Sequence, residues 1–434
     1  MPTKTLRNER TRRRKNLMRA IGRGSIAIIP SAPVRNRNRS VDYPFRQDSD
    51  FYYLTGFNEP EAVAVLIPGR TQGEYLLFCR ERDPEQETWH GRRMGIERAA
   101  EMLDVDDAFP IGDIDEILPG LIEGNERVHY SMGQDKAFDA QLMGWVNQVR
   151  AQRGHVPNEF VSLDHVLHEM RLFKTRAEIG LIRKAAKVSA AAHIRAMKAC
   201  KPGMMEYELE AEYQYEFRRN GCGYAYPPII GGGENGCILH YTENNMELSD
   251  GDLVLIDAGA EYYGYAGDIT RTFPVNGAFS EPQRELYELV LESQLAAIKK
   301  ACPGNHWNDP HTAAVRVLTK GMMNLGLLKG GLAENLREHR YRPFYMHRTG
   351  HWLGMDVHDV GDYKLDDEWR MLEPGMVLTI EPGLYVSPAR GIPKRYHNIG
   401  IRIEDDVVIT RDGCEILTKD VPKSVDEIEA LMAA

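Results

Sequence analysis

Two short segments of the chain share one pattern, which consists of a glycine, an apolar run that ends in an acidic residue, and a second glycine. They span residues 251–259 and 375–383, and each is followed by another strand-like run with a further carboxylate. The four acids concerned are Asp257, Asp268, Glu381 and Glu404. An internal repeat of this kind indicates two related half-domains that bring their carboxylates together. Because converging carboxylates repel one another unless cations lie between them, the pattern predicts a metal site.

Imidazoles accompany these acids along the same part of the chain. Any one such residue alone is more often a turn, surface or hydrogen-bonded residue than a ligand, so the prediction depends on the combination. The further candidates are His240, His347, His351, His358 and Arg402. Carboxylates with at least one imidazole and no thiolate favour Mn²⁺, Mg²⁺, Co²⁺ or Fe²⁺ over a structural zinc site. Four carboxylates exceed what one ion requires, so we expect two divalent ions, about 3.5–4 Å apart, that activate a bridging water.

The helices that must position these residues begin after residue 173. Thr175 and Glu178 have the spacing of a capping box, in which each side chain bonds the other residue's backbone amide. Helices are predicted from this box to about Lys201, and over about 207–219, 282–302 and 309–325. With the acid-bearing strands they predict an α+β domain over residues 174–434. Its helices are expected to pack against one antiparallel sheet, with the site in the concavity of that sheet.

The first part of the chain, residues 1–173, alternates strand-like and helix-like segments, which predicts a smaller α/β domain. The predicted strands are Ser25–Ile29, Ala62–Ile67, Tyr75–Cys79 and Arg127–Tyr130, and the predicted helices are Ile96–Leu103, Asp113–Leu121 and Phe138–Gln152. From about residue 154 to residue 173 the pattern lapses, and a connecting segment is expected. The basic N-terminus is interpreted as an amphipathic surface helix in preference to a mitochondrial transit peptide.

The composition argues against several classes of function. The chain has 434 residues, of which 42% are hydrophobic and 27% charged, as in ordinary soluble globular proteins. Its formal net charge of −10 argues against a nucleic-acid partner. No apolar run approaches the ~18 residues of a membrane span. Six scattered cysteines without a Cys-x-x-Cys spacing predict free thiols in a reducing compartment, and therefore a cytoplasmic protein.

Together these motifs resemble the methionine-aminopeptidase-like, pita-bread metallopeptidases, and among them the bacterial type of aminopeptidase P, the Xaa-Pro aminopeptidases. The segments that carry the resemblance are His240, Leu253–Asp257, residues 267–271, His351–Asp359, residues 380–383 and Ile401–Asp405. Residues 43–51 and 54–60 also match, and smaller relatives lack them, so the resemblance covers nearly the whole chain. It implies an α+β pita-bread catalytic domain after a smaller α/β domain. One departure is the pair Arg348-Thr349, where close relatives often carry smaller or apolar residues.

The resemblance implies a role for each ligand. Asp257 is expected to bind one ion, and His351 and Glu381 the other. Asp268 and Glu404 are expected to bridge the two ions. Glu381 is also the expected general base, which takes a proton from the bridging water or hydroxide.

The resemblance also implies roles for residues around the ligands. The imidazoles expected to hold the substrate carbonyl and stabilise the tetrahedral intermediate are His240, His347 and His358. Arg402 and Tyr385 are expected to orient the ligands. Trp89 is expected to contribute to an apolar slot for a proline ring from a neighbouring subunit. The alternative interpretation makes Trp89 a core aromatic of the N-terminal domain.

The implied activity is removal of the first residue from peptides with proline in the second position, by a hydroxide activated by two ions, most consistent with Mn²⁺. The implied assembly is a homotetramer or homodimer. A prolidase, which accepts Xaa-Pro dipeptides, would share every ligand and is the first alternative. A non-catalytic peptide- or protein-binding module of the same fold, or a metal-free relative such as creatine amidinohydrolase, would be expected to have lost ligands. None of the five predicted ligands is missing.

Overall fold

The computed structural model describes residues 4–434 and divides the chain between Met170 and Arg171 into two compact units. Each unit has hydrophobic core clusters of its own. Within the described residues, no helix is long and apolar enough to cross a membrane.

A mixed six-stranded sheet, in the order β4-β3-β2-β1-β5-β6, forms the centre of the first unit. Its strands are β1 (Ser25–Pro30), β2 (Val63–Leu66), β3 (Tyr75–Cys79), β4 (Asp107–Pro110), β5 (Arg127–His129) and β6 (Glu159–Val161). The β1–β2 and β2–β3 pairs are antiparallel, and the other three pairs are parallel. Strands β2 and β3 are buried along their whole length, which is why they read in the sequence as continuous apolar runs.

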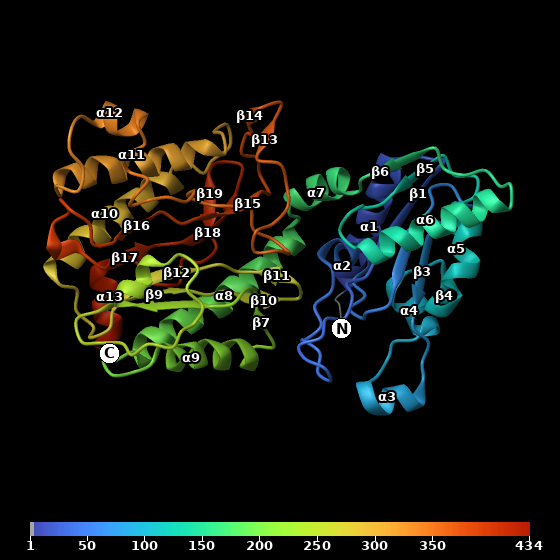
Figure 1. Cartoon of the computed structure of the whole chain (residues 1–434), viewed down its shortest axis with the longest axis horizontal. Helices are drawn as coiled ribbons and strands as arrows, with labels where there is room; N and C mark the ends of the chain where they lie inside the picture. Colours follow the sequence, from blue (N-terminus) through green and yellow to red (C-terminus); the bar gives the residue numbers. More distant parts are fainter. Residues whose placement is uncertain (1–3) are drawn as a thin grey trace. The chain divides into compact units, whose positions relative to one another are not determined.

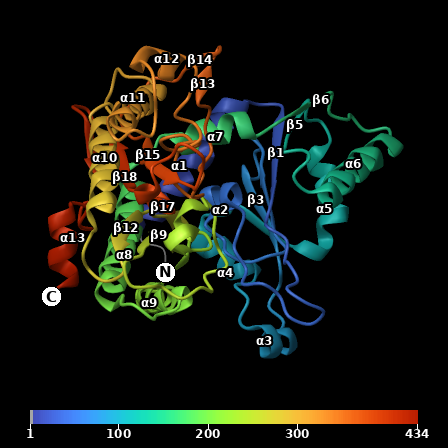
Figure 2. The same cartoon turned by 60° about the vertical axis from the view of Figure 1, so that its left-hand side comes forward.

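Helices cover both faces of this sheet, as Figure 2 shows, with α5 and α6 on one side and α1, α2 and α4 on the other. The helices of the unit are α1 (Lys4–Ile21), α2 (Ser49–Thr55), α3 (Pro84–His90), α4 (Ile96–Leu103), α5 (Ile114–Ile122), α6 (Lys136–Ala151) and α7 (Asp164–Leu172). Leu118 of α5 and Trp145 of α6 pack into one core cluster with strand residues such as Phe78. The α/β architecture predicted for this part of the chain is therefore confirmed.

Helix α1 is more deeply buried in the first unit than a surface helix would be. Its Arg13 and Arg14 are buried, and their guanidinium groups donate to the carbonyl oxygens of Tyr53 and Leu54 at 3.0 and 2.8 Å. Arg13 also lies over the ring of Tyr53, 3.9 Å from its centroid. The basic character of the N-terminus thus serves internal packing, which the charge pattern alone did not indicate.

The connecting segment predicted over residues 154–173 is wrong in part, because β6 and the whole of α7 lie within it. All three residues of β6 are exposed, so this edge strand lacks the apolar alternation that marks a strand. Helix α7 is nine residues long and carries buried Leu167 and Leu172, too few to establish a helical period.

Two pairs of helices enclose the strands of the second unit. Figure 1 shows α8 and α9 (green) on one side of these strands and α10 and α11 (gold) on the other. The helices are α8 (Arg176–Ala199), α9 (Glu206–Arg219), α10 (Glu281–Ile298), α11 (Asn308–Asn324), α12 (Leu332–Arg337) and α13 (Val425–Met432). The predicted capping box is confirmed, since Thr175 N–H donates to Glu178 Oε2 at 2.8 Å and Glu178 N–H donates to Thr175 Oγ1 at 3.4 Å.

The strands of the second unit pair antiparallel, but the prediction of one continuous sheet is wrong. They are β7 (Gly223–Tyr224), β8 (Ile229–Gly232), β9 (Leu253–Asp257), β10 (Ala260–Tyr262), β11 (Tyr265–Ala266), β12 (Thr270–Pro274), β13 (Lys364–Leu365), β14 (Glu368–Trp369), β15 (Val377–Ile380), β16 (Gly383–Val386), β17 (Ile399–Arg402), β18 (Asp405–Ile409) and β19 (Cys414–Ile416). They form separate small sheets, among them β12-β9-β8 and β15-β18-β19. Between β12 and β17 the Thr272 hydroxyl accepts from Arg402 N–H at 3.2 Å and donates to its carbonyl at 3.1 Å. At this position a side chain therefore bridges the two strands in place of backbone–backbone hydrogen bonds.

Candidate active site

A cavity of about 990 Å³ in the second unit contains nearly all the residues predicted to do chemistry. The predicted residues that line it are His240, Asp257, Asp268, His347, His351, His358, Glu381, Arg402 and Glu404. Tyr385 does not line it but contacts His347 from behind. The cavity therefore brings together side chains that lie far apart in the chain.

The sequence repeat places its acids at equivalent positions of two antiparallel strand pairs. In the first half, Asp257 closes β9, and Asp268 lies two residues before the partner strand β12. In the second half, Glu381 follows β15, and Glu404 lies directly before the partner strand β18. The backbone N–H of Glu404 donates to the carbonyl of Thr270 at 3.1 Å, which joins the halves. Each half thus delivers two carboxylates to one place.

His351 reaches the carboxylates because its segment lies directly against β15. A Cβ on Gly350 would lie 2.0 Å from the carbonyl oxygen of Thr379, so this approach requires glycine. The Nδ1 atom of His351 lies 2.9 Å from the carbonyl oxygen of Trp352 and donates to it. The Nε2 atom then faces Asp268 Oδ2 at 3.4 Å and Glu381 Oε1 at 3.6 Å. With Nδ1 fixed as the donor to Trp352, Nε2 becomes a ligand atom once its proton is displaced by a bound ion.

The donor set fits a divalent ion. Ligand atoms of Asp268, His351 and Glu404 all lie within 4.8 Å of one another. Carboxylate oxygens with one imidazole are the donors that Mn²⁺ and similar ions accept. Asp268 and Glu404 are 4% and 2% exposed, so their charges are poorly solvated by water. A buried cluster of this kind is stable when cations share it.

Burial acts to raise the pKa of each of the four acids. Burial, together with the neighbouring charge of Asp268, raises the pKa of Asp257 and raises that of Glu404 well above its ordinary value. Burial also raises the pKa of Glu381 to about 7, against the positive charges of His351 and Arg402. For Asp268 burial acts in the same direction, but the hydrogen bond and charge of His351 lower its pKa overall. The cluster therefore holds more negative charge than its protein partners neutralise.

Arg402 organises one wall of the cavity. Its buried guanidinium donates to Asp257 Oδ2 at 2.7 Å, to the Tyr385 hydroxyl at 2.9 Å and to Thr270 Oγ1 at 3.1 Å. The Tyr385 hydroxyl in turn lies 2.9 Å from His347 Nε2. The Arg402 guanidinium therefore holds Asp257 of the first repeat half directly and, through Tyr385, the imidazole of His347.

The three predicted carbonyl-binding imidazoles have different surroundings. His347 Nδ1 donates to the carbonyl of Arg348 at 2.7 Å, so its Nε2 accepts from Tyr385. Burial, followed by the charge of Arg402, lowers the pKa of His347 to about 3, so the ring is neutral. His240 and His358 are exposed at the cavity, and within residues 4–434 neither makes a hydrogen bond. These two rings are the ones positioned to reach a substrate.

Trp89 is not a core aromatic of the first unit, so that alternative interpretation is wrong. It lies on α3, a helix without buried residues, and is 78% exposed. Trp89 does not line the cavity of the second unit. A large exposed indole on a peripheral helix is compatible with a contact to another subunit.

Two hydroxyls of the site were missed by the sequence analysis. The Tyr226 hydroxyl donates to Asp257 Oδ1 at 2.6 Å and also contacts Asp268, and nothing in its segment signals this. Thr270 donates to Glu404 Oε2 at 2.6 Å. Its position two residues after Asp268 places both on one face of an extended segment, so strand alternation could have identified it.

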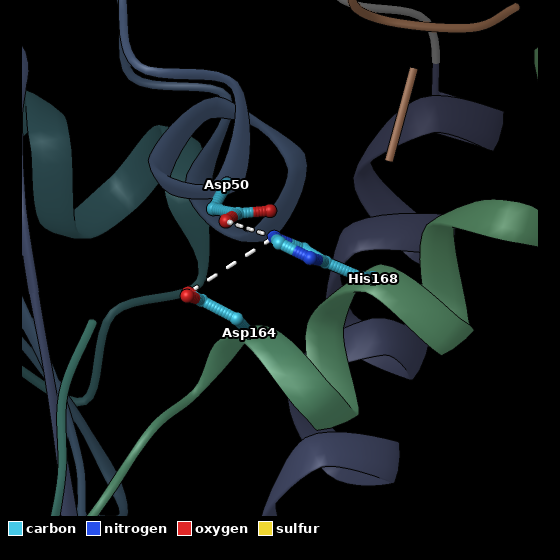
Figure 3. Close-up of side chains that lie close together, drawn as sticks. All are labelled: Asp50, Asp164 and His168. Carbon is cyan, nitrogen blue, oxygen red and sulfur yellow. Dashed lines mark ion pairs between the residues drawn. The ribbon is translucent and has the colours of Figure 1, made fainter. Parts of the chain in front are cut away.

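A second group of potential ligands lies in the first unit. Figure 3 shows Asp50 of α2 and Asp164 and His168 of α7 pointing toward one another. The His168 Nε2 atom lies 3.7 Å from Asp50 Oδ2 and 4.0 Å from Asp164 Oδ1, which are ion-pair distances. All three side chains are partly exposed. We interpret the group as an ion-paired connection between α2 and α7.

Known proteins match the chain over its whole length. Metallopeptidase family M24 matches residues 180–411, and the N-terminal domain of aminopeptidase P matches residues 11–130. The chain is 49% identical over 433 residues to the Xaa-Pro aminopeptidase of Escherichia coli (strain K12), which covers 99% of this chain and 98% of that protein. It is 44% identical over 421 residues to the Xaa-Pro aminopeptidase of Haemophilus influenzae, which covers 97% and 96%. The solved structure of Pseudomonas aeruginosa aminopeptidase PepP superimposes with a TM-score of 0.98 at 57% identity, covering 100% of this chain and 98% of that one.

Proposed function

This chain belongs to metallopeptidase family M24 and carries the N-terminal domain of aminopeptidase P, and from that premise we propose that it is an Xaa-Pro aminopeptidase. It hydrolyses the bond between the first residue of a peptide and a proline in the second position. The observation that carries the proposal is the convergence of four carboxylates from both repeat halves with His351 in one cavity. The full-length similarity to two bacterial Xaa-Pro aminopeptidases supports the substrate class.

The five predicted ligands would hold two divalent ions, and we propose Mn²⁺. In this assignment Asp257 belongs to one ion, and His351 and Glu381 belong to the other. Asp268 comes from the first half of the repeat and Glu404 from the second, their ligand atoms lie within 4.8 Å of each other, and they would serve both ions. When bound, such ions polarise a carbonyl and lower the pKa of a water to near 7.

Glu381 is the proposed general base. Its carboxylate lines the cavity, with Oε1 3.6 Å from His351 Nε2, so it can take a proton from a water held at the site. Water attacks the carbonyl carbon of the first residue, and Glu381 accepts the proton that the water loses. As the C–N bond breaks, the proton passes to the proline nitrogen, which leaves as a secondary amine.

The imidazoles stabilise the charge that develops on the substrate. His240 and His358 face the cavity and can donate to the oxygen of the tetrahedral intermediate. His347 is a neutral ring with both nitrogens engaged, so we propose that it positions Tyr385 and through it Arg402.

Two features account for the selectivity. We propose that the α-amine of the peptide lies beside Asp257 and donates to its carboxylate, which confines cleavage to the first residue. The bond to proline has no N–H, so the site must accept the ring on an apolar surface instead of bonding a hydrogen. Trp307, Tyr363 and Trp369 line the same cavity. We propose that Trp89 of a neighbouring subunit completes this surface.

Hydrolysis of three peptides tests the proposal, with chelated enzyme before and after addition of Mn²⁺. We expect Mn²⁺ to restore cleavage of Gly-Pro-Leu, with little cleavage of Gly-Pro or Gly-Ala-Leu. Cleavage of Gly-Pro alone would identify a prolidase. Absence of cleavage in metal-loaded protein would point to a binding module, although no predicted ligand is missing.

The assembly and the cellular location of the enzyme are proposed from the same premise. We propose a homotetramer or homodimer, because the exposed indole of Trp89 would then be covered. We also propose a cytoplasmic location. All six cysteines are free thiols, as expected for a reducing compartment.

A further inference from the structure

A second cavity, of about 540 Å³, lies beside the active-site cavity in the same unit. The two cavities share His347, Arg348 and Trp369. The second cavity is bounded by one face of α11 and by the loop that leads to His347. Of its lining, the chemistry described above uses only the shared residues His347 and Trp369.

This second cavity is strongly basic. Arg316 of α11, Arg342 and Arg348 line it, and we call these residues the arginine pocket. Among the described residues, no aspartate or glutamate lines the cavity, and no carboxylate pairs with any of the three guanidinium groups. Guanidinium groups stay charged at any pH that proteins tolerate, so the pocket holds uncompensated positive charge.

A neighbouring arginine, Arg340, shows that the lack of carboxylate partners is confined to the pocket. Arg340 is two residues from Arg342 and donates to Glu334 at 2.7 Å and to Glu338 at 2.6 Å. The acids of this surface are thus paired with Arg340, outside the pocket. Arg340 is therefore neutralised by two carboxylates, whereas the three arginines of the second cavity are not.

Arg348 is held in place within the pocket. Its Nη1 donates to Asn308 Oδ1 at 2.8 Å, and its guanidinium carbon lies 4.8 Å from the centroid of the Trp369 ring. Nearby, burial and then the charges of Arg348 and Arg342 lower the pKa of His311 to about 4, which leaves that ring neutral. The positive charge therefore resides on the arginines, and one of them is oriented at the junction of the two cavities.

We propose that the arginine pocket binds a carboxylate of the peptide substrate on the leaving side of the scissile bond. The inference rests on the proposed function, since an aminopeptidase leaves every residue after the first on that side. Arg348 directly follows His347 and lines both cavities, so a peptide that leaves the active site along this wall meets the pocket. Guanidinium groups match carboxylates in charge and in fork geometry. The enzyme would then prefer peptides with an acidic residue some positions after the proline.

Matched peptides test this preference. C-terminally amidated pentapeptides Gly-Pro-Ala-Ala-Ala are made with Glu or Gln at position three, four or five. We expect kcat/KM for Glu to exceed that for Gln by about two- to fivefold at one position, as for exposed ion pairs. Because each residue extends a peptide by ~3.5 Å, the favoured position reports how far the pocket lies from the scissile bond. The preference should grow at low ionic strength.

Two variants distinguish binding at the arginine pocket from a general electrostatic attraction between the enzyme and acidic peptides. The triple variant Arg316→Gln, Arg342→Gln and Arg348→Gln should bring the Glu/Gln ratio close to one. Arg218→Gln, on α9 across the strands from α11, removes the same kind of charge and should keep the ratio. A wild-type ratio near one at every position would overturn the proposal, and so would a ratio that survives the triple variant.

Inorganic phosphate distinguishes a peptide subsite from a site for a free anion. It is added at millimolar concentration to wild type and triple variant, and Tm is recorded. Stabilisation that requires the arginines, without any Glu preference, would make the pocket a site for a free anion and overturn the substrate assignment. If neither peptide is cleaved, the proposed function fails, and calorimetric binding of the same Glu and Gln peptides then decides on the pocket alone.

Discussion

Replacement of Arg402 by methionine tests the electrostatic account of the site. The Arg402 side chain is almost fully buried and bonds Asp257, Tyr385 and Thr270 at 2.7–3.1 Å. Methionine keeps much of the volume but removes the positive charge and all three donors. Asp257 then stays buried beside Asp268 without its cationic partner.

The size of the effect follows from this geometry. Removing one member of a buried ion pair costs about 3–5 kcal/mol, because the other charge is left uncompensated. In chelated protein we therefore expect the free energy of unfolding to fall by about 4 kcal/mol, and Tm by roughly 8–16 °C. Divalent ions at Asp257 would supply the missing positive charge. With saturating Mn²⁺ the loss should shrink to about 2 kcal/mol, the value of the two lost neutral hydrogen bonds.

Urea unfolding followed by circular dichroism, in EDTA and in Mn²⁺, measures both losses. Arg183→Met is the matched control, because Arg183 pairs with Glu415 at 3.0 Å but both side chains are more than a third exposed. Its loss should stay below about 1 kcal/mol in either buffer. A loss below about 1 kcal/mol for Arg402→Met in EDTA would refute the reasoning. A larger loss with Mn²⁺ than without it would do the same.

Other substitutions separate the remaining assignments. Asp268→Ala or Glu404→Ala should abolish activity and remove at least one bound ion, and full occupancy by mass spectrometry of the metals would contradict their bridging role. Glu381→Gln should lower kcat more than it raises KM, so an unchanged kcat would exclude Glu381 as the base. In chelated protein the pKa of Glu381 is raised from 4.5 to about 7, so the stability it contributes is fully present below pH 4.5 and is lost as pH rises through 7. That loss is about 3 kcal/mol and should vanish in Glu381→Gln, which urea titrations at pH 4.5 and 8 would show. Trp89→Ala should reduce the preference for Gly-Pro-Leu over Gly-Ala-Leu and weaken assembly in sedimentation, whereas intact selectivity would place the proline slot elsewhere.

The repeat was the part of the site most accessible from sequence. Strand pairs with the same apolar run and the same closing acid fold alike, so Asp257 and Glu381 occupy equivalent strand ends. Helix α8 was equally accessible, because its capping box and its apolar face are local signals. Local chemistry alone is enough to specify such elements, because the cap residues bond each other within one turn.

Contacts that depend on distant segments were not accessible. Tyr226 contacts Asp257 and Asp268 only because segments distant in the sequence fold together, and no local pattern indicates that contact. The hydrogen bond at Nε2 of His347 likewise follows from the placement of Tyr385, 38 residues away. The edge strand β6 escaped detection because its side chains face water.

Two adjacent acids show how the structure separates stability from chemistry. Asp405 and Glu404 point to opposite faces of one extended segment, and both are buried. Asp405 pairs with Arg271 at 2.8 Å and Lys423 at 2.6 Å, whose charges overcome burial and lower its pKa to about 2. Glu404 faces the cavity, and burial with the charge of Asp268 raises its pKa well above the ordinary value. Arg271 and Lys423 thus neutralise Asp405, which holds the strand, whereas Glu404 has no such pair of cations and is left for a metal ion. Metal binding and folding should therefore be coupled in this unit.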